Sequence, residues 1–210
     1  MFAPDIKFTR FVLFANGLVP AALLAWDAYH GKLGANPIEF ATRATGVLAL
    51  LFLLVTLAVT PLRKLTGAHW LVKLRRQVGL YAFFYGCLHL LTYVWFDKFF
   101  GAREIAEDVW ARPFITIGMA SFLLLVPLAA TSTTGMIKRL GGKRWAKLHK
   151  LTYVAAVGGV VHFYMGVKAD TTIPILFAAA LAALLGYRWL RSRMDATPES
   201  ETLGIQTPPR

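Results

Sequence analysis

Two histidines lie deep inside apolar stretches of this 210-residue chain. His89 follows the charged residue Arg76 by thirteen positions, and His162 follows Lys150 by twelve. If both stretches are helices that start at the same membrane face, a rise of about 1.5 Å per residue places both imidazoles roughly 18–20 Å deep. Neutral imidazole is a good metal ligand, and two imidazoles at one depth suit the two axial positions of a haem. The spacing therefore predicts His89 and His162 as axial ligands of one haem iron.

Simpler interpretations of these residues stay open. A histidine inside a span can instead be a polar group that hydrogen-bonds a neighbouring helix. Small residues also surround the pair and suit either a large flat ligand or close helix packing; they are Gly86 near His89, and Ala155, Gly158, Gly159 and Gly166 near His162. The matched depth of the two histidines favours ligation over a hydrogen-bonding role.

Six apolar runs are long enough, or nearly so, to cross a bilayer, which takes roughly 17–25 residues. All six tryptophans fall at the ends of these runs or between them, as in the aromatic belt of membrane proteins. The first run follows two cations as a signal peptide does, but no small-residue cleavage site closes it. We predict an all-α integral membrane protein with six transmembrane helices and a haem held within the bundle. The uncharged limits of the runs are Phe11–Trp26, Ala44–Leu62, Gln77–Phe96, Pro113–Ile137, Leu151–Val167 and Thr171–Tyr187.

Positive charge alternates between the connecting segments. The N-terminal segment, the second and fourth connections and the C-terminal segment together hold 17 Lys and Arg residues, whereas the other three connections hold six. Because Lys and Arg accumulate in cytoplasmic loops, both termini are predicted to be cytoplasmic. Residues 1–191 are predicted to form one transmembrane domain that holds the haem, and residues 192–210 a disordered cytoplasmic tail.

The composition argues against several classes of protein. With 57% hydrophobic and 16% charged residues, the chain is too apolar for an ordinary soluble domain, which has about 25% charge, and for a disordered one. Its net charge of +12 is explained by cytoplasmic loops, without a nucleic-acid partner. The single cysteine, Cys87, excludes an internal disulfide and multi-cysteine metal sites. A transporter would show broken helices and buried charges, and neither is visible in the sequence. A zinc enzyme would need ligands beyond the two histidines, and the sequence lacks them.

Several segments resemble the MsrQ family, also called YedZ, the haem-binding membrane subunits of a bacterial periplasmic methionine-sulfoxide reductase system. The wider superfamily is the ferric-reductase and NADPH-oxidase transmembrane domain, in which histidines on the third and fifth helices hold two stacked b-type haems. The resemblance implies that His89 and His162 are the outer ligands and that His149 is an inner one. The segments that carry it are Arg75–Tyr81, His89–Tyr93, Arg112–Thr116, Pro127–Ser132, Gly135–Ile137 and Trp145–Leu151.

Arg75 stands fourteen positions before His89, where the superfamily has its inner ligand on the third helix. The resemblance therefore leaves the second haem open: it is absent, or His149 binds it with a weak or unusual partner such as Arg75. Because arginine is always protonated and is a poor ligand, a simple loop charge is the favoured interpretation of Arg75. A place beside a haem propionate or a flavin phosphate would also suit it.

The resemblance implies an electron-transfer subunit that has no complete active site of its own and lies in the bacterial inner membrane. The implied donor is the quinone pool or a cytoplasmic flavin, with FMN as an associated cofactor, and the implied acceptor is a periplasmic molybdopterin-containing methionine-sulfoxide reductase. A ferric reductase or oxidase with another acceptor is the alternative. No G-x-G-x-x-G pattern is present, so direct hydride transfer from NAD(P)H is not expected. The acidic connection from Asp97 to Arg112 is either a docking segment for the periplasmic partner or an ordinary solvated loop.

Overall fold

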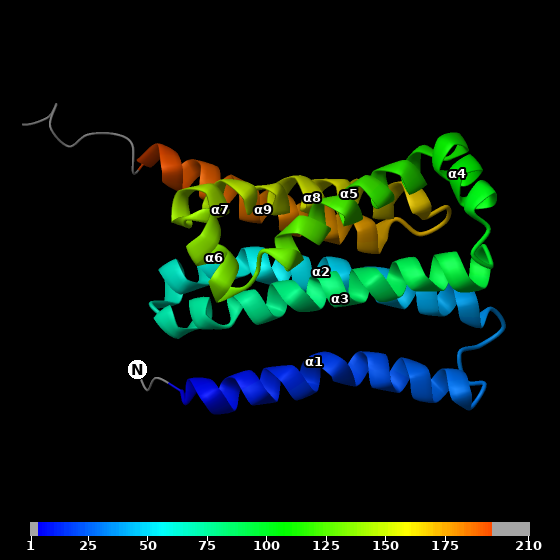
Figure 1. The fold of residues 1–210 in the computed structure, drawn as a ribbon, viewed down its shortest axis with the longest axis horizontal. Coiled ribbons are helices and arrows are strands. Elements are labelled where there is room, and N and C mark those ends of the chain that lie inside the picture. The colour runs from blue at the N-terminus through cyan, green and yellow to red at the C-terminus, as the bar shows by residue number, and fades with distance from the viewer. Residues whose placement is uncertain (1–3, 195–210) are drawn as a thin grey trace, which may run out of the picture.

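The computed structural model describes residues 4–194, and these residues form helices joined by short connections (Figure 1). The spans begin and end at ordinary helix signals: Asn36 and Pro37 start one helix, and Gly67, at a φ of 70°, ends it. In chain order the helices are α1 (Ile6–Tyr29), α2 (Pro37–Thr66), the 3₁₀ turn η1 (His69–Lys73), α3 (Arg75–Leu91), the π-helical segment η2 (Thr92–Asp97), α4 (Ala102–Ala111), α5 (Pro113–Ala130), α6 (Thr134–Leu140), α7 (Gly142–Leu148), α8 (Leu151–Gly166) and α9 (Thr172–Met194).

Among residues 4–194, five helical segments are long and apolar enough to cross a membrane: α1, α2, α3 together with η2, α5 and α9. The sixth predicted span corresponds to α8, which has 16 residues. At about 1.5 Å per residue this helix is roughly 24 Å long, less than a hydrocarbon core of about 30 Å. The all-helical membrane architecture is therefore confirmed, and the sixth span stays a prediction.

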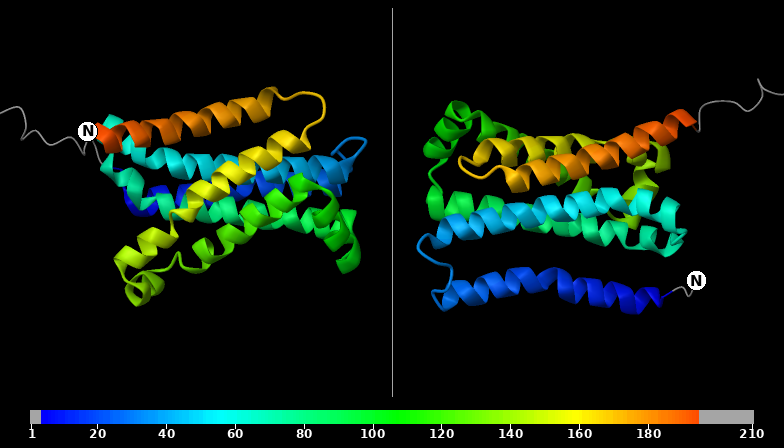
Figure 2. Two further views of the ribbon diagram at one scale, coloured as in Figure 1. Left: turned by 90° about the horizontal axis from the view of Figure 1, so that it is seen from above. Right: turned by 180° about the vertical axis from the view of Figure 1, so that it is seen from behind.

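The ends of the bundle differ in the way that the charge pattern predicts. The start of α1, the C-terminal end of α9 and the short helices α6 and α7 gather at one end, whereas α4 lies at the other (Figures 1 and 2). The basic second and fourth connections thus share an end with the start of α1 and the end of α9. Of the predicted tail, Ser192 to Met194 belong to α9, and residues 195–210 lie outside the described part.

Helix α1 lies along one side of the bundle, and two tyrosines of α3 hold it there (Figure 1). The hydroxyl of Tyr81 donates to the Phe14 carbonyl, and that of Tyr85 donates to the Gly17 carbonyl, both at 2.7 Å. A Cβ atom at position 17 would collide with the Tyr81 ring. Because Gly17 lacks that atom, α3 can approach α1 closely at this level.

The buried core lies where α2, α3, α8 and α9 meet. His89 and His162 lie beyond it, toward the end of the bundle that holds α4. The members of the core are mostly leucine, as expected for spans that pack on one another through apolar faces; they are Leu50, Leu53, Leu54, Leu57, Ala82, Ala156, Val160 and Leu181. This packing fixes the positions of α3 and α8, the two helices that carry His89 and His162.

Candidate functional site

His89 projects from α3 toward the neighbouring helix α2. Its ring atom Nδ1 lies 2.8 Å from the backbone carbonyl oxygen of Thr42. A carbonyl only accepts hydrogen bonds, so Nδ1 carries the proton and Nε2 keeps its lone pair. This is the tautomer of a metal-binding histidine whose other nitrogen is held by a backbone carbonyl.

His162 repeats this arrangement on the other side of the bundle. Its Nδ1 lies 2.7 Å from the carbonyl oxygen of Phe114 on α5, so its Nε2 also keeps the lone pair. The Phe114 ring stacks on the imidazole, with centroids 5.9 Å apart and an interplanar angle of 26°. Helix α8 thus presents a second imidazole that is oriented by a backbone carbonyl.

The two imidazoles lie close together, with ring centroids 5.9 Å apart and an interplanar angle of 76°. No described residue forms a hydrogen bond with Nε2 of either ring. With metal–nitrogen bonds of about 2 Å and ring radii of roughly 1 Å, two imidazoles on opposite sides of one metal ion have centroids roughly 6 Å apart. The distance of 5.9 Å between the two rings is close to this value, so the structure brings His89 and His162 together, and their role as haem ligands stays a prediction.

Sequence reasoning missed the groups that orient the pair. These are the carbonyls of Thr42 and Phe114, and two glycines that lie against the rings, Gly46 and Gly118. The glycines that it did single out pack against other side chains: Gly158 faces Ser121, Gly159 faces Leu50, and Gly86 faces Phe122. Close helix packing, the simpler of the two interpretations, accounts for these three.

His149 is placed differently from the other two histidines. It follows the last residue of α7, and its Nε2 lies 3.1 Å from the Thr131 hydroxyl. Trp145 stacks on its ring at a centroid distance of 3.9 Å and donates its indole N–H to the Thr131 carbonyl at 2.9 Å. Burial, and then the positive charge of Arg75, lower the pKa of His149. Its Nε2 is thus engaged by protein, unlike that of His89 or His162.

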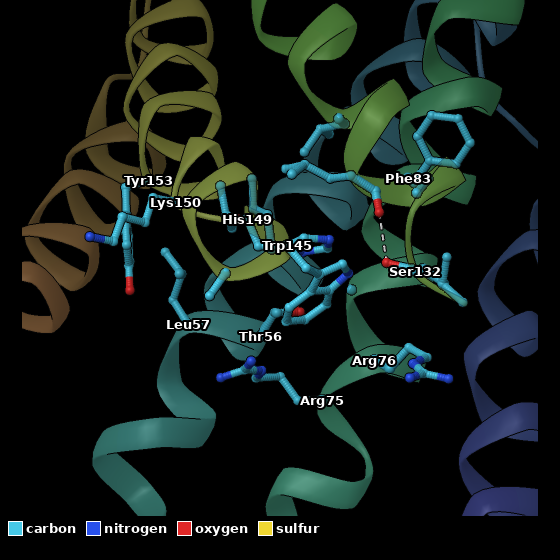
Figure 3. A pocket seen from close by; sticks show the side chains of 18 of the residues that line it. Thr56, Leu57, Arg75, Arg76, Phe83, Ser132, Trp145, His149, Lys150 and Tyr153 are labelled. Atoms are coloured by element: carbon cyan, nitrogen blue, oxygen red, sulfur yellow. Dashed lines mark hydrogen bonds between the residues drawn. The ribbon is translucent and has the colours of Figure 1, made fainter. Parts of the chain in front are cut away.

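A cavity of about 410 Å³ opens beside His149, at the end of the bundle that holds the basic connections (Figure 3). Of the described residues, four cations line it, namely Arg75, Arg76, Lys150 and Arg188, and no acidic residue does. Trp145, His149 and Tyr153 add aromatic surface to its wall. The structure therefore brings His149 and Arg75 to one cavity that suits an anionic ligand with an aromatic ring.

Arg188, in the wall of this cavity, replaces a backbone hydrogen bond that Pro61 removes from α2. Proline lacks an N–H, so the Leu57 carbonyl, four residues earlier in α2, loses its helical donor. The Arg188 guanidinium donates to that carbonyl at 2.6 Å and to the Tyr153 hydroxyl at 3.0 Å. One cation of α9 thereby joins α2 and α8 at the edge of the cavity.

The comparisons with known proteins agree with this geometry. The family described as the ferric reductase like transmembrane component matches residues 44–160. Three proteins named protein-methionine-sulfoxide reductase heme-binding subunit MsrQ are also similar to the chain. That of Herminiimonas arsenicoxydans is 51% identical over 87% of this chain and 84% of its own length. That of Azospira oryzae is 53% identical over 84% and 76%, and that of Ralstonia nicotianae is 44% identical over 91% of both. This chain belongs to the MsrQ family.

The family match begins within α2 and ends within α8, so in this MsrQ-family chain it contains His89 and stops two residues before His162. No solved structure matches the chain significantly. In the part of the chain that the structure describes, no group of three or more His, Cys, Asp and Glu side chains is arranged to hold a metal ion. A pair of imidazoles is the ligand set of a haem, whereas a zinc site needs more protein ligands.

Proposed function

We propose that this MsrQ-family protein is a b-type cytochrome subunit of the bacterial inner membrane. His89 and His162 would hold one haem b through their Nε2 atoms. A haem held in this way supplies one-electron transfer, with a potential set by its ligands and by burial. The observation that carries the proposal is the pair of imidazoles whose Nδ1 atoms are held by backbone carbonyls and whose ring centroids lie 5.9 Å apart.

The chain's own residues would hold the ligands in place and exclude water. The Thr42 and Phe114 carbonyls fix the tautomer and orientation of the rings and make Nε2 more basic. The buried leucines and alanines of the core keep the surroundings of the two histidines apolar. More basic ligands stabilise the oxidised, more positive state of a bound iron and lower its potential. Apolar burial disfavours that extra charge and raises the potential.

Electrons would enter from the cytoplasmic side, where the cavity at His149 is the proposed donor site. Its four cations complement a flavin phosphate or haem propionates, and its aromatic side chains suit a flat ring. FMN, a quinone or a second haem bound by His149 are the ligands proposed by resemblance. For the last of these, His149 must give up its contact with Thr131.

Electrons would leave toward the periplasm. The proposed acceptor is a periplasmic molybdopterin-containing methionine-sulfoxide reductase that repairs oxidised proteins. The support is the name of the relatives, which are heme-binding subunits of a protein-methionine-sulfoxide reductase, together with the charge asymmetry that puts α4 on the outer side.

The test of the function is the spectrum of purified variants. His89→Ala and His162→Ala should each abolish the reduced b-type α-band, because one missing ligand leaves an open iron and an unpaired imidazole. His30→Ala is the control, since His30 ends α1 and its side-chain hydrogen bond and ring contacts with described residues, to the Trp26 carbonyl and the rings of Trp26 and Tyr29, lie within that helix. A colourless preparation of the fully loaded native protein would overturn the proposal. Retention of a native spectrum by both variants would refute this ligand pair.

A further inference from the structure

Each of the two paired imidazoles lies against a glycine of the neighbouring helix. A Cβ atom at Gly46 would stand 2.9 Å from Nδ1 and 3.0 Å from Cε1 of His89. A Cβ atom at Gly118 would stand 2.6 Å from Nδ1 and 2.7 Å from Cε1 of His162. Real side chains do not approach this closely, so any other residue at either position would displace the ring.

The two glycines occupy equivalent positions relative to the carbonyls that anchor the rings. Gly46 lies four residues after Thr42 on α2, and Gly118 lies four residues after Phe114 on α5. In a helix, residues four apart stand one above the other on the same face. Each ring therefore lies across one helical turn, bonded to the carbonyl at one end and resting on the glycine at the other.

The glycine also explains how the ring reaches a carbonyl that belongs to a helix. The Thr42 and Phe114 carbonyls lie within the helical hydrogen-bonding pattern, so an imidazole must share an oxygen whose second lone pair lies beside the helix. A side chain one turn later would cover that oxygen. Without it, Nδ1 reaches 2.8 Å in one case and 2.7 Å in the other.

We infer that Gly46 and Gly118 are positioning residues for the two haem ligands: each leaves the space in which an axial imidazole bonds a backbone carbonyl and turns its Nε2 toward the shared site. The inference rests on the proposed haem ligation by His89 and His162. The helix pairs α2–α3 and α5–α8 thus carry the same three-part device, a carbonyl, a glycine four residues later and a histidine on the partner helix.

The experiment compares Gly46→Ala and Gly118→Ala with Gly166→Ala and Gly186→Ala. A Cβ at Gly166 would meet only Phe114, at 3.9 Å, and one at Gly186 would meet nothing within 4 Å. Loss of a group that orients a metal ligand typically costs 10–100-fold in metal affinity, so about a tenfold or greater loss of haem affinity is expected for the first two variants. The two controls should bind haem as the native protein does.

A second readout separates positioning of the ligands from general damage. In the variants that retain haem, a displaced imidazole should change the low-spin electron paramagnetic resonance signal and shift the midpoint potential. Native values of both in Gly46→Ala and Gly118→Ala, with native haem content, would overturn the inference. His89→Ala would still lose the haem in that case, so the proposed function would stand without it.

A double-mutant cycle keeps the inference testable if the single variants fold poorly. Gly46→Ala is combined with His89→Ala, and Gly118→Ala with His162→Ala, and the thermal stability of the haem-free proteins is measured. Removing the ring removes the collision, so each alanine should cost far less stability in the histidine-free background than in the native one. Equal costs in both backgrounds would show that the glycines serve helix packing alone and would refute the inference.

Discussion

The guanidinium of Arg188 donates to the Leu57 carbonyl at 2.6 Å, in the one turn of α2 where Pro61 provides no backbone N–H. A charged side chain thus takes the place of a missing helical hydrogen bond, on a helix that is predicted to lie in the membrane. Unsatisfied backbone groups are costly in such surroundings, so this contact explains why α9 carries a cation near the cavity.

Replacing Arg188 should therefore destabilise the protein unless α2 is repaired at the same time. Arg188→Met removes the bonds to Leu57 and Tyr153, with an expected loss of about 1–3 kcal/mol. Adding Pro61→Ala restores an N–H for the Leu57 carbonyl and should recover part of that loss. Thermal unfolding in detergent measures both effects. Equal stability of the single and the double variant would show that the carbonyl is not what Arg188 serves.

The ion pair between Lys98 and Asp108 should make stability depend on pH. The two side chains lie 2.6 Å apart and join the turn at Phe99 and Phe100, whose φ angles are 46° and 60°, to α4. The hydrogen bond from Lys98 lowers the pKa of Asp108 below its ordinary 3.8, and the same bond raises the pKa of Lys98 above 10.5. Both charged forms therefore stabilise the folded state.

The Asp108 contribution is complete above pH 3.8 and is lost as the pH falls through its lower folded pKa. The Lys98 contribution is complete below pH 10.5 and is lost as the pH rises through its higher folded pKa. At neutral pH, Asp108→Asn should lower the melting temperature by about 2–4 °C, and the difference from the native protein should shrink in acid. A difference that is constant from neutral pH to pH 2 would contradict this assignment.

Reporter fusions test both the topology and the status of α8. Fusions after Arg76 and Lys150 should report the cytoplasm, and fusions at Glu107 and Lys168 should report the periplasm. Lys150 and Lys168 lie on either side of α8, so opposite signals from these two positions show that α8 crosses the membrane. The same signal from both would mean that this 16-residue helix does not span.

The structure sharpens the prediction that the segment from Asp97 to Arg112 docks a partner. Asp108 is paired with Lys98 and Arg112, and Glu107 is paired with Arg103 at 2.8 Å. Glu104 is exposed and forms no ion pair with a described residue. Its charge is therefore the one that a partner would meet.

We expect Glu104→Lys to slow haem re-oxidation by the periplasmic reductase roughly two- to fivefold at low salt, since charges at the rim of an interface act mainly on the association rate. Stopped-flow re-oxidation with a methionine-sulfoxide substrate measures this rate. Glu107→Gln is the matched control and should have a smaller effect. An unchanged rate and an unchanged salt dependence for Glu104→Lys would exclude α4 from the docking surface.

The sequence was sufficient to predict the pairing of His89 and His162 because helix rise and the positions of the flanking charges fix depth. It was not sufficient to identify Gly46 or Gly118, since those contacts depend on the rotation of α2 and α5 about their axes, which depth does not report. For the same reason, the sequence could not decide whether the glycines near His162 on its own helix make room for a flat ligand or for close helix packing. A glycine at the histidines' depth on each neighbouring helix was the signal that could have found them.

His149 shows a second limit of prediction from spacing. Its distance of thirteen residues from His162 suggests one continuous helix, yet α7 ends at Leu148 and α8 begins at Leu151. The Thr131 hydroxyl that contacts His149 comes from the end of α5. A break between two helices and a contact across eighteen residues both arise from tertiary packing, which the apolar periodicity of a single segment does not encode.

The arrangement of carbonyl, glycine and histidine, which occurs twice in the bundle, has a consequence for the assembly of the protein. Helices α2 and α3 are neighbours in the chain, whereas α5 and α8 are separated by α6 and α7, so the second half of the site closes only after α8 has been made. Each half offers a single imidazole. A cofactor that needs both would be retained only when the two halves have come together, so its retention would report completed membrane assembly.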